Sequence, residues 1–178
     1  MKSFKKLLIT AVLALMPTLI FAQTAAFDKY DGQDDVTAVV VTKKMFKMMG
    51  DVKNKENQQY LNLISKLDNL RVFTTQSSRV TSDMKATSDK YVKSAGLEEL
   101  MRVTEKGQNI KILVKSGKSD TNVRELLMFI EGSGKNETVL MSLTGDFDLN
   151  DISMLTDKLN LPGGDGLKKA SKGAKGSK

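Results

Sequence analysis

The sequence predicts a single α+β domain with two layers, in which a mixed, mostly antiparallel sheet carries its helices mainly on one face. Two observations support this. Apolar residues recur at helical spacing in much of the first half of the chain, and from residue 97 onward they alternate as in strands. A length of 178 residues is enough for about one domain. The predicted order of elements is βαβαββββα.

The first predicted strand covers residues 36–41 (VTAVVV). Its β-branched residues fall on both faces, which favours a central strand buried on both sides. An aspartate in place of Val39 or Val41 is therefore expected to unfold the domain, because it would bury an unpaired charge.

Two helical stretches follow, each with apolar residues at i, i+3, i+4 and i+7: Met45, Met48, Met49 and Val52, then Tyr60, Leu63, Ile64 and Leu67. The second stretch is predicted over 55–69. Gly50 breaks or bends the first, so the two form either separate helices or one interrupted helix. Residues 70–76 form the second strand, and the connection from the first strand is expected to cross over with a right hand.

The rest of the domain begins with a helix over residues 78–94, ended by Gly96. Four strands then form a meander over 97–104, 110–115, 123–131 and 138–144, with glycine-containing turns between them. Asp148 is the expected N-cap of the last helix, whose core side carries Ile152, Leu155 and Leu159.

Residues 1–22 have the three parts of a secretory signal peptide: early lysines, an apolar run of moderate length and a small residue, Ala22, before the expected cleavage point. The mature chain would begin at Gln23. No cysteine is available for lipid attachment, so we expect an exported, soluble protein in the periplasm or outside the cell.

Four segments follow from this pattern: the signal peptide, an acidic lead-in at 23–35, the α+β domain at 36–161 and a disordered tail rich in glycine and lysine at 162–178. The formal net charge of +7 is concentrated at the ends, since residues 23–166 keep 20 basic and all 21 acidic residues. The stretch 167–178 is a candidate contact for polyanions such as anionic lipid or polysaccharide, although a solvated tail without a partner explains the same composition. Nucleic acid is disfavoured, because the tail lacks aromatic side chains that stack on bases.

Five runs of sequence together resemble a known family: VTAVVVTKKMFKMM (36–49), LISKLDNLRVFTT (63–75), LEELMRVTEKGQNIKILVK (97–115), VRELLMFIEG (123–132) and LMSLTGDFDLNDISML (140–155). The family is domain-of-unknown-function family 4252, found mainly in Bacteroidota, and the resemblance covers roughly 28–159. It implies an exported domain of the periplasm or envelope. It implies no activity and no catalytic residue.

The chain contains no cysteine, histidine or tryptophan. This composition excludes disulfides, Cys/His zinc sites and nucleophiles activated by histidine. We therefore predict no catalytic, cofactor-binding or metal-binding residue.

Three patterns that resemble metal sites have simpler explanations. The helical methionines Met45, Met48 and Met49 offer thioether ligands for Cu(I), but a methionine-rich core is the better explanation, because each lies in an otherwise apolar stretch and no histidine is present to complete a copper site. Residues 146–151 (DFDLND) resemble the start of an EF-hand loop, yet aspartate stands where the turn needs glycine, and a capped helix accounts for the same residues. The acidic lead-in, with Asp28, Asp31, Asp34 and Asp35, is expected to be a solvated loop rather than a calcium site.

Three short motifs resemble catalytic or phosphate-binding signatures. Ser82 and Lys85 match S-x-x-K, and 115–117 (KSG) resembles the second motif of penicillin-recognising serine enzymes. Residues 116–119 imitate the end of a phosphate loop, but Ile112 occupies the position of its first glycine. We interpret all three as chance matches.

The sequence therefore predicts an exported, non-enzymatic envelope domain with a binding or interaction role, with a possible protein partner in the envelope. Two alternatives remain open. One is a hydrolase that uses a serine and a lysine or a pair of carboxylates. The other is a structural protein whose basic tail contacts anionic lipid or polysaccharide.

Overall fold

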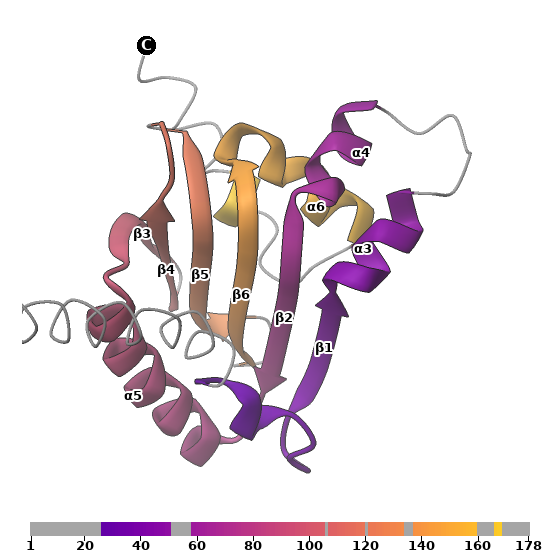
Figure 1. Ribbon diagram of the computed structural model, residues 1–178. Helices are drawn as coiled ribbons and strands as arrows, with labels where there is room; N and C mark the ends of the chain where they lie inside the picture. The colour runs from indigo at the N-terminus through magenta and orange to yellow at the C-terminus, as the bar shows by residue number, and fades with distance from the viewer. Residues whose placement is uncertain are drawn as a thin grey trace, which may run out of the picture.

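The computed structural model describes residues 26–50, 58–105, 107–119, 121–133, 137–159 and 166–168, and these form an α+β domain built on one six-stranded sheet (Figure 1). The strands are β1 (Thr37–Thr42), β2 (Leu67–Thr75), β3 (Glu98–Glu105), β4 (Gln108–Ser116), β5 (Asn122–Ser133) and β6 (Glu137–Asp148). The helices are α3 (Lys43–Gly50), α4 (Gln58–Ser65), α5 (Ser78–Ala95) and α6 (Ile152–Leu159), with 3-10 turns η2 (Asp28–Tyr30) and η3 (Leu149–Asp151). The predicted class and order of elements are confirmed.

Every pair of neighbouring strands is antiparallel, in the order β1-β2-β6-β5-β4-β3. The prediction of a mixed sheet with a right-handed crossover after the first strand was wrong. The chain returns from β1 through α3 and α4, which contact each other, and β2 then lies directly beside β1. Antiparallel neighbours need no crossover. The second helix also ends earlier than predicted, so that Leu67 and Asn69 belong to β2.

Strand β1 lies at the edge of the sheet, which contradicts its predicted central position. The side chains of Val39 and Val40 are 47% and 41% exposed. A run of β-branched residues indicates a strand, but it does not say how many neighbours the strand has. Aspartate at Val39 was expected to unfold the domain because it would be buried on both faces of the sheet. That reason is wrong for Val39, which is exposed, and it does not hold for Val41, which is only partly buried.

Helices cover both faces of the sheet, so the domain has three layers rather than the predicted two. One face packs under α3, α4 and α6 through Phe46, Ile64 and Leu155. The other face packs under α5 and the segment around η2 (Figure 1). Neighbouring residues of a strand divide between these two cores, as with Met128 in the first and Phe129 in the second.

The acidic lead-in contributes two aromatic side chains to the core, although it was predicted to be a solvated loop. Phe27 and Tyr30 are buried between α5 and the sheet. The ring of Phe27 meets that of Tyr91 edge-on at 5.0 Å, and the ring of Tyr30 lies 5.8 Å from that of Phe73. The folded part therefore begins before residue 36.

The C-terminal part follows the prediction as far as the last helix. The Asp148 side chain accepts a hydrogen bond from the Asn150 amide at 2.8 Å, so the predicted cap is confirmed, although it caps η3 and α6 begins at Ile152. Leu167, expected in the disordered tail, is instead completely buried in the first of the two cores, and the preceding Gly166 lies against Ile110 of β4. The predicted signal peptide and residues 162–165 and 169–178 of the tail lie outside the described residues.

The different burial of two leucines on strands predicts how much each contributes to the free energy of unfolding. We expect Leu143→Ala in β6, whose side chain is completely buried, to lower the free energy of unfolding by about 2–5 kcal/mol. The matched control Leu100→Ala, on edge strand β3, should change it by no more than about 0.5 kcal/mol. Urea denaturation followed by circular dichroism measures both, and equal losses would contradict the assignment of β6 to the core.

Candidate functional site

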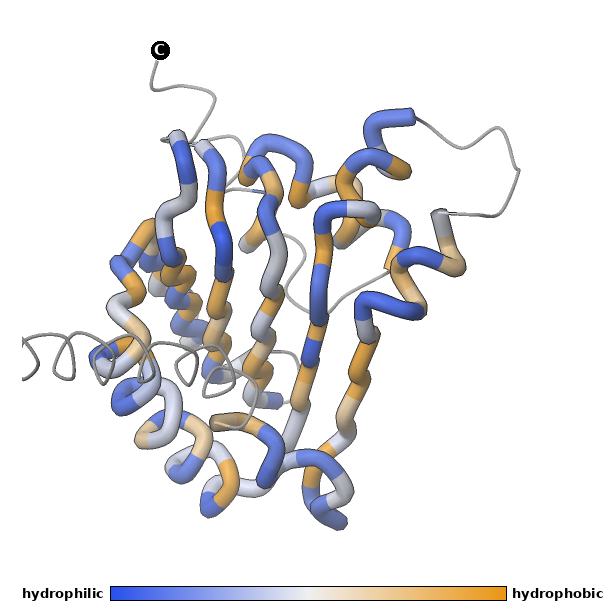
Figure 2. The backbone as a smooth tube through the Cα atoms, viewed as in Figure 1, coloured by the Kyte–Doolittle hydropathy of each residue, from blue (hydrophilic) through white to orange (hydrophobic). Residues whose placement is uncertain are grey.

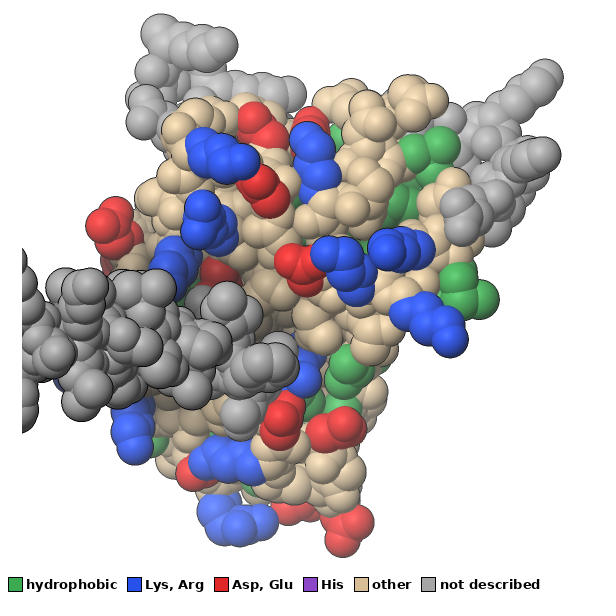
Figure 3. Space-filling model, in the orientation of Figure 1, with side chains coloured by type: hydrophobic (Ala, Val, Ile, Leu, Met, Phe, Trp, Pro, Cys, Tyr) green, Lys and Arg blue, Asp and Glu red, His purple; other side chains and the backbone are tan. Residues whose placement is uncertain are grey.

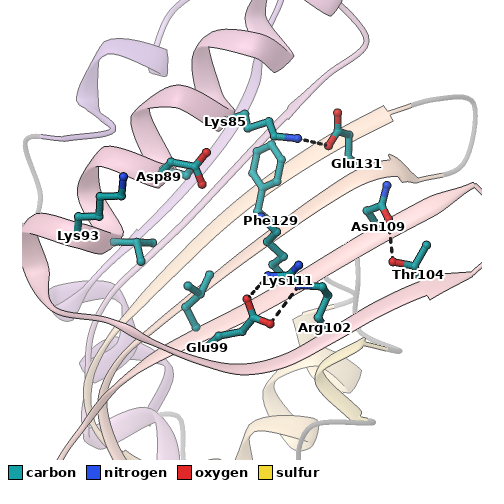
Figure 4. Close-up of a pocket in the computed structure, with 13 residues that line it drawn as sticks. Lys85, Asp89, Lys93, Glu99, Arg102, Thr104, Asn109, Lys111, Phe129 and Glu131 are labelled. Carbon is teal, nitrogen blue, oxygen red and sulfur yellow. Dashed lines mark hydrogen bonds and ion pairs between the residues drawn. The ribbon is translucent and has the colours of Figure 1, made fainter.

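A cleft of about 500 Å³ lies between α5 and the strands β3, β4 and β5 (Figure 4). We call it the α5 cleft. Its helical wall is formed by Lys85, Ser88, Asp89, Val92 and Lys93, and its sheet wall includes Glu99, Arg102, Lys111, Leu113, Phe129 and Glu131. The cleft exists because α5 covers only part of this face, leaving the region near β3 and β4 open to solvent.

Strand register brings the residues of the sheet wall together. Arg102 of β3 lies opposite Lys111 of β4, which in turn lies opposite Phe129 of β5. Opposed residues in an antiparallel sheet point to the same face, so these three side chains form one row beneath the cleft. A second row contains Thr104, Asn109 and Glu131.

Part of the charge in the α5 cleft is neutralised internally. The Arg102 guanidinium donates two hydrogen bonds to the Glu99 carboxylate, one of them 3.1 Å long, and these hold the pKa of Glu99 below its usual range. The Lys85 ammonium lies 3.2 Å from a Glu131 carboxylate oxygen. Figure 4 shows both pairs: Lys85 and Glu131 join the helical wall to the sheet wall, whereas Glu99 and Arg102 pair along β3.

Other polar groups of the cleft have no such partner. Within the described part of the chain, Lys93, Lys111 and Asp89 make no ion pair or hydrogen bond through their side chains, although the positive charge of Lys111 also helps to lower the pKa of Glu99. The Ser88 hydroxyl is more unusual, because this side chain is only 5% exposed and its oxygen has no hydrogen-bond partner among the described residues. Buried hydroxyls are normally hydrogen-bonded, so Ser88 is an exception among the polar side chains that line the cleft.

Three contacts fix α5 over the sheet and so determine the shape of the cleft. The Thr81 hydroxyl donates to Thr138 at 2.9 Å, and Lys85 contacts Glu131 as described. Near the end of the helix, the Tyr91 hydroxyl donates to the Glu125 carboxylate at 2.6 Å. Burial raises the pKa of both Glu125 and Tyr91. Because these contacts are spread along α5, the helical wall is held at both ends.

The carboxylates of the EF-hand-like run serve separate partners. Asp146 accepts a hydrogen bond from Asn122 at 2.7 Å, Asp148 caps Asn150, and Asp151 accepts from Gln59 at 2.6 Å. Among the residues that the structure describes, no group of three or more acidic, histidine or cysteine side chains is placed to hold a metal ion. The lead-in carboxylates Asp28 and Asp35 contact Arg71 and Arg79.

The methionines divide into two groups. Met84, Met128 and Met141 are buried, as a methionine-rich core requires. Met45 and Met48 are 50% and 58% exposed, which contradicts that interpretation for them. Helix α3 instead packs against the core through Phe46. The helical spacing of the methionines had indicated a different buried face of this helix.

The motifs that resemble enzyme signatures are not assembled into a site. The Ser82 hydroxyl donates to the Ser78 carbonyl at 3.0 Å, while Lys85 turns to Glu131. The loop after β4 closes on Asn122, which accepts hydrogen bonds from the Gly117 and Lys118 amides.

The α5 cleft was not predicted from the sequence. Side chains alternate along β4, so Lys111 lies on one face of the sheet while Ile110 and Ile112 lie on the other. This alternation is the one sequence signal that could have indicated a lysine on the face of the cleft. The position of Ser88 depends on how α5 packs, and no local pattern encodes that.

Comparison with known families identifies the domain. The family described as "Domain of unknown function (DUF4252)" matches residues 30–155, which span the sheet and the α5 cleft. The chain belongs to the DUF4252 family. The resemblance seen in the sequence is thereby confirmed. No curated protein and no solved structure matches the chain. In the described part of this DUF4252 protein, no helix combines the length and apolar character that a membrane crossing needs.

The buried Glu125 carboxyl should give stability a characteristic pH dependence. Its pKa is raised by burial, so the folded state binds the proton more tightly than the unfolded state, whose pKa is near 4.5. The resulting stabilisation is complete below that unfolded value and is lost as the pH rises through the folded value. We therefore expect Glu125→Gln to lose less free energy of unfolding than the parent between pH 4.5 and neutral pH.

Chemical denaturation at a series of pH values measures this effect. Glu98→Gln is the matched control, since Glu98 is exposed on β3 and should leave the pH profile of the parent unchanged. A Glu125→Gln profile parallel to that of the parent would show that burial does not perturb this carboxyl.

Proposed function

We propose that this DUF4252 protein is an exported, non-catalytic binding domain of the cell envelope, and that the α5 cleft is its site for a small organic anion. The observation that carries the proposal is the Ser88 hydroxyl, buried beside the cleft without a hydrogen-bond partner among the described residues. The same cleft is lined by two lysines, Lys93 and Lys111, which have no ion-pair partner in the described part of the chain.

The ligand class follows from these groups. A hydroxyl and two ammonium groups together donate hydrogen bonds to a carboxylate or phosphate, and bonds to a charged acceptor are the stronger kind. The same cleft is lined by Val92, Leu113 and Phe129, which offer apolar surface to the organic part of a ligand. Asp89 adds one acidic group, so a ligand with an amine as well as an anion is also accommodated.

Binding is favoured over hydrolysis by the surroundings of the candidate nucleophiles. A serine nucleophile needs a base within hydrogen-bond reach of its hydroxyl. The Ser88 hydroxyl has no hydrogen-bond partner among the described residues, and the Ser82 hydroxyl donates to a backbone carbonyl. Lys85, the lysine of the S-x-x-K match, contacts Glu131.

Substitution of a cleft lysine tests the proposal. With benzoate and inorganic phosphate as probes, we expect saturable shifts of amide resonances at the cleft in a two-dimensional NMR titration. Lys111→Ala should weaken binding about tenfold or more, which corresponds to the loss of one charge-assisted hydrogen bond of about 1.5 kcal/mol. Ser88→Ala should weaken it as well, because it removes the buried donor.

Lys90→Ala is the matched control, since Lys90 is exposed on α5 and does not line the cleft. It should bind both probes like the parent. Binding that falls equally in the Lys90 and Lys111 variants would indicate general charge attraction, and the absence of shifts with both probes would refute the proposed site.

Export is tested separately. Expression of the full chain in a Gram-negative host, followed by fractionation and mass spectrometry, should yield a periplasmic protein that begins at Gln23. Retention of residues 1–22 on the recovered protein would contradict the proposed signal peptide. The parent with Ala22→Arg is the control, because a large charged residue before the cleavage point should block processing.

A further inference from the structure

The free edge of β1 combines exposure with an uncharged, apolar sequence. Its residues are Thr37–Thr42 (TAVVVT), and Figure 2 shows the strand as largely hydrophobic although it lies at the edge of the sheet. Of the five large hydrophobic side chains that the described structure exposes, four lie on β1 or on α3 directly after it: Val39, Val40, Met45 and Met48. Figure 3 shows hydrophobic side chains on this side of the molecule.

The opposite edge of the same sheet is protected in the usual way. Strand β3 (EELMRVTE) carries several charged side chains, and Arg102 pairs with Glu99 along it. Charges on an edge strand discourage pairing with another strand, and β1 has none. The two edges therefore differ in charge, which is the property that discourages an edge strand from pairing with another strand.

We propose that β1 pairs antiparallel with β1 of a second copy of this chain, joining two six-stranded sheets into one continuous sheet. Backbone groups of a strand point alternately to its two sides, and two directly opposed residues must either both point theirs toward the partner strand or both point them away. In a symmetric pair, this requirement places one residue of β1 opposite itself on the two-fold axis. The proposed register places Val39 opposite Val39.

Charge complementarity selects this register. Two aspartates, Asp34 and Asp35, precede β1, and two lysines, Lys43 and Lys44, follow it. Asp35 and Lys43 already pair with Arg79 and Asp68 within the chain. With Val39 on the axis, the turn before β1 in each copy comes near the first turn of α3 in the other, and the charges left for a contact between the copies are those of Asp34 and Lys44. Both of these side chains are exposed and make no ion pair within the described part of the chain.

The remaining pairs of the register also suit a sheet. Ala38 would oppose Val40, and Thr37 would oppose Val41, so that small and β-branched residues face one another across the axis. Helix α3 begins where β1 ends and projects beyond this edge (Figure 1), so Met45 and Met48 provide further apolar surface beside the paired strands. The proposal does not depend on the α5 cleft, which lies at the other edge of the sheet.

The oligomeric state of the mature chain is the first test. Light scattering coupled to size-exclusion chromatography should give twice the mass of one chain. Val39→Lys should halve that mass while the far-ultraviolet circular dichroism is retained. Leu100→Lys, at a similarly exposed position on β3, is the control and should remain dimeric. A monomeric parent, or a dimer that survives Val39→Lys, would overturn the proposal.

Cysteine crosslinking tests the register, and the chain has no native cysteine to interfere. In Val39→Cys the two thiols would face each other across a pair of opposed residues, whose Cα atoms lie about 4.5–5.5 Å apart. In the control Val40→Cys they would be diagonal neighbours about 7–8 Å apart, which is too far for a disulfide. Oxidation should therefore crosslink the first variant and not the second.

Charge exchange provides a third, independent readout. Lys44→Asp should raise the dimer dissociation constant by placing like charges together, and the double variant Lys44→Asp with Asp34→Lys should restore it. Equal crosslinking of both cysteine variants, or no rescue in the double variant, would exclude this register.

Discussion

The burial of β5 and β6 on both faces is the constraint on which the rest of this domain depends. Leu126 and Met128 face one core while Leu127 and Phe129 face the other, and β6 divides in the same way. A sheet whose central strands are apolar on both sides must be covered on both sides, because exposing either face would leave a large apolar surface in water. Helices α3, α4 and α6 cover one face, and α5 with the segment around Tyr30 covers the other.

The α5 cleft is a consequence of this arrangement. One helix and a short aromatic segment cannot cover a face of six strands, so the region near β3 and β4 remains open. The residues there are no longer required to be apolar, and Arg102, Lys111 and Glu131 occupy it. Buried polar contacts, above all the one between Tyr91 and Glu125, then fix the helix at a defined position where apolar packing alone would allow it to slide. The cost is a carboxyl whose raised pKa lowers stability as the pH rises through it.

Sequence patterns predicted the local structure well and its spatial arrangement less well. The period of apolar residues gave the order of helices and strands, and Gly96 and Asp148 were correctly identified as end signals because capping is a local interaction. The position of β1 at the edge was missed, since VTAVVV would suit a strand with one neighbour or two. The buried positions of Phe27, Tyr30 and Leu167 were missed for a related reason: each is an isolated apolar residue in a polar segment, and its burial depends on surfaces formed by distant parts of the chain. The cleft residues come from four separate elements, so no spacing within one element could reveal them.

The two edges of the sheet have different consequences for function. The charged edge at β3 borders the α5 cleft, whereas the apolar edge at β1 is the one we propose to pair with a second copy. A two-fold axis between antiparallel strands is perpendicular to the sheet, so it exchanges the copies without exchanging the faces. The two clefts of the proposed dimer would therefore open on the same side of one continuous sheet, at its two far ends. A ligand carried on a surface, such as an anionic group repeated along a polymer, could then engage both clefts at once, and the second contact would be strengthened by the effective concentration that the first provides.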